Sequence, residues 1–152
     1  MKTVRHLILA VIAAFSMVSC QNDGHIGWLY GVWRVAEFSV NGEVDNSEIV
    51  AQTTFSFQSN IVQVVTNTDQ YGSAQSLFGT WKQDGDNFEL NFHNSDSQTA
   101  PGTGMYAAPW WLGFSSKAPM MMKLSDRKGD HFTLTWTDDE GKVNVYKFRK
   151  TW

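Results

Sequence analysis

Thiols are almost absent from this sequence, which has a single cysteine, Cys20, among its 152 residues. One cysteine cannot form an intramolecular disulfide, and it leaves no set of thiolates for zinc. The fold must therefore be held together by its apolar core alone. Seven Trp, four Tyr and ten Phe make such a core feasible, because each aromatic side chain buries a large apolar area.

Basic side chains are also too few for a typical nucleic-acid-binding protein. The sequence has 12 Lys and Arg against 15 Asp and Glu, which gives a net charge of −3. A basic surface supplies most of the affinity that proteins have for nucleic acids. The charge balance therefore argues against a nucleic-acid partner.

Motifs of catalysis and metal binding are missing as well. His25, His93 and His131 lie too far apart for a metal-ligand pair, and we expect them at the surface. Residues 102–107 match G-x-G-x-x-A loosely, but prolines flank them where a dinucleotide site needs a strand and a helix. No serine-nucleophile elbow occurs, and no carboxylate pair stands in an apolar setting. We expect no enzyme activity, no metal and no cofactor.

No apolar run reaches the ~20 residues that a membrane-spanning helix needs. Residues 7–18 are apolar, follow the basic Lys2 and Arg5, and stop at a small residue, which is the pattern of a secretory signal. Residues 17–20, Met-Val-Ser-Cys, resemble the bacterial lipobox. The resemblance implies cleavage before Cys20, a lipid on that cysteine, and a membrane anchor in the cell envelope, where we expect the outer membrane.

The chain is therefore expected to have three parts: a signal peptide at 1–19, a lipidated cysteine and tether at 20–29, and one domain at 30–152. The mature chain would keep 133 residues, enough for one domain, with 10 basic against 15 acidic side chains and a net charge of −5.

Short strands separated by turn residues fill most of this domain. Asn41-Gly42 is a strong hairpin signal, and residues 88–92 alternate apolar with polar side chains. The segments expected to be strands are 30–40, 53–59, 61–66, 75–83, 88–92, 120–124, 132–137 and 143–149. This all-β pattern of about eight antiparallel strands predicts an up-and-down barrel or a sandwich, and residues 43–51 fit a short helix or a loop.

Two motifs at the ends of this pattern resemble those of lipocalins. Gly31-Val32-Trp33 stands at the start of the first strand, where lipocalins carry Gly-x-Trp, and Arg149 lies near the end of the last strand. The resemblance is to lipocalin-like bacterial lipoproteins, and it implies an eight-stranded barrel. It also implies that Arg149 packs over Trp33 to close one end, an alternative being that Arg149 points to solvent.

Residues 95–119 form a long connection without a strand pattern, polar first and then strongly apolar. Three interpretations remain open: a plug that completes the core, a lid over a ligand, or a contact with a partner or the membrane. The side chains that would line a ligand site are Tyr106, Trp110, Trp111 and Phe114, with Met120 and Met122 in the following strand.

Two functional hypotheses follow. The first is a lipid-anchored, extracytoplasmic, lipocalin-like protein that binds a small apolar ligand inside its barrel. The second is a structural or interaction lipoprotein with a filled barrel that contacts a protein or a glycan. They differ in the interior, because an eight-stranded barrel either fills with side chains or holds one small ligand.

Overall fold

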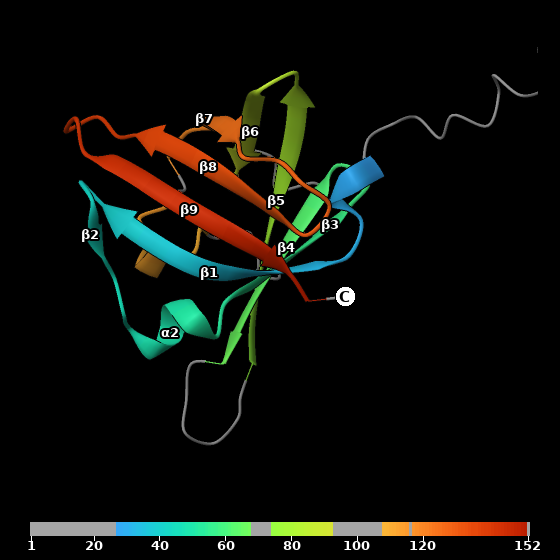
Figure 1. The fold of residues 1–152 in the computed structure, drawn as a ribbon, viewed down its shortest axis with the longest axis horizontal. Helices are drawn as coiled ribbons and strands as arrows, with labels where there is room; N and C mark the ends of the chain where they lie inside the picture. The colour runs from blue at the N-terminus through green and yellow to red at the C-terminus, as the bar shows by residue number, and fades with distance from the viewer. Residues whose placement is uncertain (1–26, 68–73, 93–107, 116, 152) are drawn as a thin grey trace, which may run out of the picture.

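The computed structural model describes residues 27–67, 74–92, 108–115 and 117–151. These residues form nine strands, two short 3-10 helices and one turn of α-helix (Figure 1). The strands are β1 (Val32–Val40), β2 (Glu43–Val44), β3 (Thr54–Gln58), β4 (Ile61–Asn67), β5 (Ala74–Asp84), β6 (Asn87–Asn91), β7 (Met120–Ser125), β8 (His131–Thr137) and β9 (Val143–Lys150). The helices are η1 (Gly27–Leu29), α2 (Glu48–Ala51) and η2 (Trp110–Leu112).

The sheet closes on itself. Its strands follow one another in the order β2-β1-β3-β4-β5-β6-β7-β8-β9, all pairings are antiparallel, and β1 also pairs with β9. Apart from the two-residue β2, this is a closed eight-stranded antiparallel barrel, which confirms the predicted fold class. The prediction left a sandwich open, and the β1–β9 pairing excludes it.

Side-chain alternation decides which residues face the interior. Along β7, buried and exposed residues alternate without a break, so that Met120, Met122 and Leu124 point inward. The hairpin after β1 is formed by Asn41 and Gly42, whose φ angles are 52° and 85°. Positive φ at both central residues matches the twist of the flanking strands, which is why Asn-Gly is preferred there.

One irregularity in β1 lets the sheet close. The pairing with β9 shifts register between Val35 and Glu37, so the inward positions change from Trp33 and Val35 to Phe38. Before this bulge β1 pairs with β3 along its other edge, and after it β1 pairs with β2. A β-bulge bends and twists a strand, and here it allows β1 to serve both neighbours.

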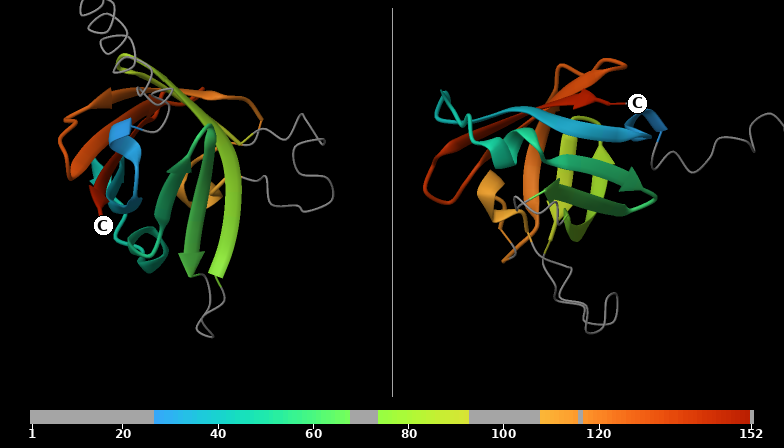
Figure 2. Two further views of the ribbon diagram at one scale, coloured as in Figure 1. Left: turned by 90° about the vertical axis from the view of Figure 1, so that its right-hand side faces the viewer. Right: turned by 90° about the horizontal axis from the view of Figure 1, so that it is seen from below.

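The barrel has two different ends. The β3–β4, β5–β6 and β7–β8 turns lie at the same end as η1, which we call the η1 end. The opposite end carries α2, η2 and the β8–β9 turn, and we call it the mouth end. Figure 2 shows α2 and η2 next to each other there. No helix among the described residues is long and apolar enough to cross a membrane.

Candidate functional site

Aromatic rings make up about half of the buried apolar side chains of the barrel, together with Leu, Val and Met. Phe57 packs edge-on against Trp81 and Phe88, and Trp81 stacks on Phe88 with ring centroids 5.7 Å apart. Nearer the mouth end, Phe55 contacts Phe148 and Phe114. Such contacts between rings stabilise the fold beyond the area they bury, and they leave few polar groups inside.

One polar group in this interior has no partner. The indole N–H of Trp81 is buried, and no acceptor among the described residues lies within hydrogen-bonding distance. Its strand position is firmly fixed, because the Trp81 backbone N–H donates to the carbonyl of Asn60 at 3.0 Å. An unsatisfied buried donor costs about 1–3 kcal/mol, so this indole is a place where a ligand acceptor would be stabilising.

At the mouth end, residues 108–115 enter the barrel, and we call them the mouth segment. Trp111, Leu112 and Phe114 are buried, and the Trp111 indole N–H donates to the Thr53 hydroxyl at 3.0 Å. The backbone turns at Gly113, where φ is 72°, a conformation that favours glycine. These side chains complete the core of the mouth end, as the plug interpretation predicts.

A buried tyrosine holds this segment in place. The hydroxyl of Tyr146 donates to the carbonyl of Leu112 at 2.8 Å, and its ring lies 4.8 Å from that of Phe114. Burial raises the pKa of Tyr146 well above its usual range, so the hydroxyl stays protonated and remains a donor. The latch on the mouth segment is therefore independent of pH in the physiological range.

The other residues predicted to line a ligand site fall into three groups. Met120 and Met122 are buried in the core, whereas Met121 between them is 60% exposed. Trp110 is 75% exposed and stands outside the interior, so it does not line a barrel site. Tyr106 lies outside the described residues.

The predicted pair of Arg149 and Trp33 is wrong. Trp33 is fully buried near the η1 end and its indole N–H donates to the carbonyl of Leu29 at 2.7 Å. The cation over its ring is Lys150, whose Nζ lies 5.3 Å from the ring centroid. Arg149 is exposed, because it follows the inward-facing Phe148 and therefore points out of the barrel. Gly31 precedes β1 with φ of 122°, a conformation that favours glycine.

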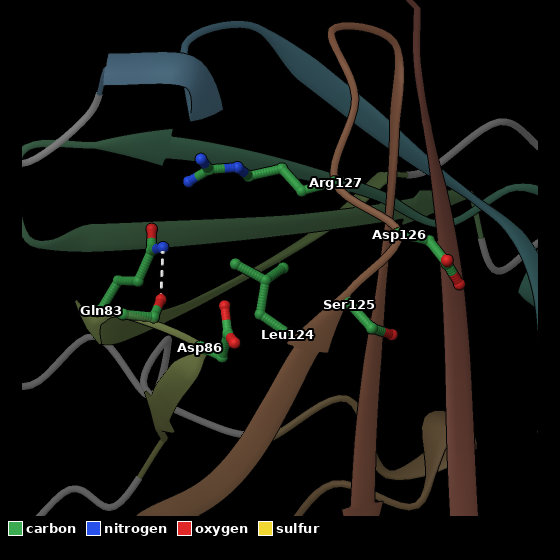
Figure 3. A pocket seen from close by; sticks show the side chains of 7 residues that line it. Gln83, Asp86, Leu124, Ser125, Asp126 and Arg127 are labelled. Carbon is green, nitrogen blue, oxygen red and sulfur yellow. Dashed lines mark hydrogen bonds between the residues drawn. The ribbon is translucent and has the colours of Figure 1, made fainter.

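The η1 end carries a polar hollow of about 620 Å³ between the β5–β6 and β7–β8 turns (Figure 3). Its lining comes from Gln83, Gly85, Asp86, Leu124, Ser125, Asp126 and Arg127. No motif in the sequence indicated this site, because each turn reads as an ordinary polar hairpin. Trp28 of η1 lies beside it, with Arg127 over its ring at 5.4 Å. Among the residues that the structure describes, no three His, Cys, Asp or Glu side chains gather as metal ligands.

Comparison with solved structures agrees with this architecture. A lipocalin-like protein from Bacteroides uniformis ATCC 8492 aligns over 82% of this chain and 99% of its own, with 16% identity and a TM-score of 0.54. The fold of this chain is lipocalin-like. An uncharacterized protein from Bacteroides eggerthii DSM 20697 has the same arrangement, with 20% identity, a TM-score of 0.58, and coverage of 80% of this chain and 98% of that one. No protein-family model and no curated protein matches the sequence.

The lipocalin-like fold agrees with the resemblance predicted from the sequence, but the residues that sequence reasoning missed are as informative as those it found. The sequence predicts a strand at Trp81 but no role for its side chain, because its unpaired N–H depends on which acceptors the other strands bring near. The lipocalin resemblance predicts Arg149 above the Trp33 ring, whereas the structure places its neighbour Lys150 there. Alternation along β9 was the signal that would have found it, since Asn144, Tyr146 and Phe148 all face inward.

Proposed function

We propose that this protein is a lipid-anchored, extracytoplasmic binding protein that holds a small, mainly apolar molecule with a hydrogen-bond acceptor inside its barrel. The observation that carries the proposal is the buried indole N–H of Trp81, which has no partner in an apolar interior. Ligand sites of small molecules have this composition, an apolar wall with a few placed polar groups. A carbonyl or ether oxygen of the ligand would accept from Trp81.

The anchor rests on the sequence. Residues 17–20 follow the apolar stretch of the signal and end at the only cysteine. Replacing Cys20→Ser is expected to abolish incorporation of labelled fatty acid and to leave the precursor uncleaved. Normal processing of the variant, with no label on the wild type, would exclude lipidation.

Two tryptophan variants test the binding site. Each loses an indole N–H, but that N–H has no partner at Trp81 and is hydrogen-bonded at Trp111. Trp81→Phe removes a donor with no partner, so the expected result is little change in stability and a loss of the preference for a ligand that carries an acceptor. Trp111→Phe removes a donor that is bonded to Thr53, so it is expected to lower stability by about 1 kcal/mol and to leave binding intact.

The probes are a medium-chain aliphatic ketone and the alkane of equal length, with native mass spectrometry as the readout. Wild type is expected to bind the ketone about tenfold more tightly than the alkane, and Trp81→Phe to remove that preference. Equal binding of both probes by wild type, or an unchanged preference in Trp81→Phe, would contradict the role of Trp81.

The second candidate function is that of an interaction protein with a filled barrel. It is favoured by the mouth segment, which is packed into the core while Trp110 within it is 75% exposed. An exposed tryptophan on a rigid, buried segment suits an interaction surface. Absence of binding for every apolar probe, together with loss of a partner in Trp110→Ala, would favour this candidate.

A further inference from the structure

The hollow at the η1 end is built by a connected set of bonds. The indole N–H of Trp28 donates to Gln83 Oε1 at 3.1 Å, and Gln83 Nε2 donates to the carbonyl of Gly85 at 2.9 Å. The backbone N–H of Leu124 donates to the carbonyl of Asp86 at 2.8 Å, which ties the β7 end to the β5–β6 turn. The two turns and η1 therefore form one preorganised frame around the hollow.

Of the three charged residues that line the hollow, Asp86 and Arg127 carry opposite charges on one side of it, and neither is neutralised within the described residues. The guanidinium of Arg127 is held over the Trp28 ring, yet it forms no ion pair with a described carboxylate. The carboxylate of Asp86 likewise has no described cationic partner. Figure 3 shows Gln83, Asp86, Leu124 and Arg127 on the same side of the β7–β8 turn, whereas Asp126 extends to the other side.

We propose that this hollow binds a small zwitterion, with the anionic oxygens on Arg127 and the ammonium group on Asp86. A purely anionic ligand would be repelled by Asp86, and a purely cationic one by Arg127. An arginine fork suits a phosphate or a carboxylate, and it binds more strongly through charge-assisted bonds than a neutral donor would. Neither Trp81 nor the rings of Phe57 and Phe88 that pack against it line this hollow, so the two sites are tested with different residues.

Two sources of such a zwitterion are chemically equivalent at these residues: an ethanolamine phospholipid headgroup and a free amino acid. The headgroup source rests on the proposed lipid anchor. Cys20 precedes Gly27 by seven residues, so an anchor would hold the η1 end within about 25 Å of the lipid. The hollow would then be at the end of the barrel nearest to the headgroups.

The test uses the mature protein in maltoside detergent, with binding followed by calorimetry. The probes are glycerophosphoethanolamine and glycine as zwitterions, with glycerophosphoglycerol and ethylamine as analogues that carry one charge. Arg127→Gln and Asp86→Asn remove one charge each, and Asp84→Asn, at the end of β5 and outside the lining of the hollow, removes a nearby carboxylate as the matched control.

At least one zwitterion is expected to bind about tenfold more tightly than either single-charge analogue. Arg127→Gln and Asp86→Asn should each remove this preference, while Asp84→Asn should keep it. Preference for glycerophosphoethanolamine over glycine identifies the headgroup as the source, and the reverse identifies the amino acid. Equal binding of glycerophosphoglycerol and the zwitterions, no effect of Asp86→Asn, or no binding of any probe would overturn the proposal. The preference of the wild-type protein for the ketone over the alkane, which tests the site at Trp81, is a separate measurement that none of these outcomes changes.

Discussion

Adjacent tryptophans in the mouth segment offer a stringent test of whether this segment is part of the core. Trp111 is 8% exposed and donates to Thr53, whereas Trp110 is 75% exposed. The two rings contact each other at 5.8 Å, so an alanine at either position removes that shared contact. The difference between the two variants therefore reports burial and the hydrogen bond alone.

The magnitude follows from the surroundings of each ring. Replacing a buried aromatic side chain with alanine costs about 3–5 kcal/mol, and the lost hydrogen bond to Thr53 contributes about 1 kcal/mol within that range. Trp110→Ala should cost at most about 1 kcal/mol, because Trp110 is 75% exposed and its ring contact among the described residues is with Trp111. We expect Trp111→Ala to be less stable than Trp110→Ala by about 3 kcal/mol.

Urea unfolding followed by far-ultraviolet circular dichroism measures both values, because the signal reports the barrel and a domain of this size is expected to unfold in one step. A cost below about 1 kcal/mol for Trp111→Ala would refute the plug and show that the segment leaves the barrel readily. Similar large costs for both variants would show that Trp110 is buried in solution by something else.

Three further predictions concern other parts of the barrel. Lys150→Ala should lower stability by about 0.5–1 kcal/mol through the lost contact with Trp33, while Arg149→Ala should change it by less than about 0.5 kcal/mol; thermal melts that reverse this order would contradict the assignment. Burial raises the pKa of Tyr146 in the folded state, so the stability that this residue contributes is fully present below its unfolded pKa of about 10. Above that pH the unfolding free energy should fall by up to about 1.4 kcal/mol per pH unit, because the unfolded chain loses the tyrosine proton first. Tyr146→Phe should remove that part of the slope in alkaline urea titrations. Gly79→Ala should cost about 1–3 kcal/mol in the same assay, because its Cβ would lie 2.7 Å from a Phe92 ring carbon and 2.8 Å from a backbone oxygen.

The strands were predictable because their signals are local. Turn residues such as Asn41-Gly42 mark hairpins, and alternation such as that of residues 88–92 marks a strand with one buried face. All eight expected strands are present with bounds close to those predicted, and residues 43–51 contain the short α2. The bulge between Val35 and Glu37 has no such signal, because it is required by the two neighbours that β1 must serve.

The side chains at the sites were less predictable, for two physical reasons. The lipocalin resemblance predicts that Arg149 lies over Trp33. Period-two alternation from the inward-facing Phe148 instead points Lys150 inward, and Lys150 is the cation over that ring. Outside the strands no alternation applies, so Trp110 and Trp111 looked equivalent although one is exposed and the other buried. The hollow at the η1 end depends on turns that only the barrel topology brings together.

The geometry of the proposed anchor bears on the third interpretation of the mouth segment, contact with the membrane. The described chain begins at η1, and β1 runs from there to the mouth end over nine residues, about 30 Å when fully extended. A lipid on Cys20 would hold the η1 end near the bilayer and leave the mouth end on the far side of the barrel. With the barrel upright on such a tether, Trp110 would lie far from the lipid surface. In that orientation, the proposed anchor favours a partner other than the lipid bilayer as the contact of Trp110.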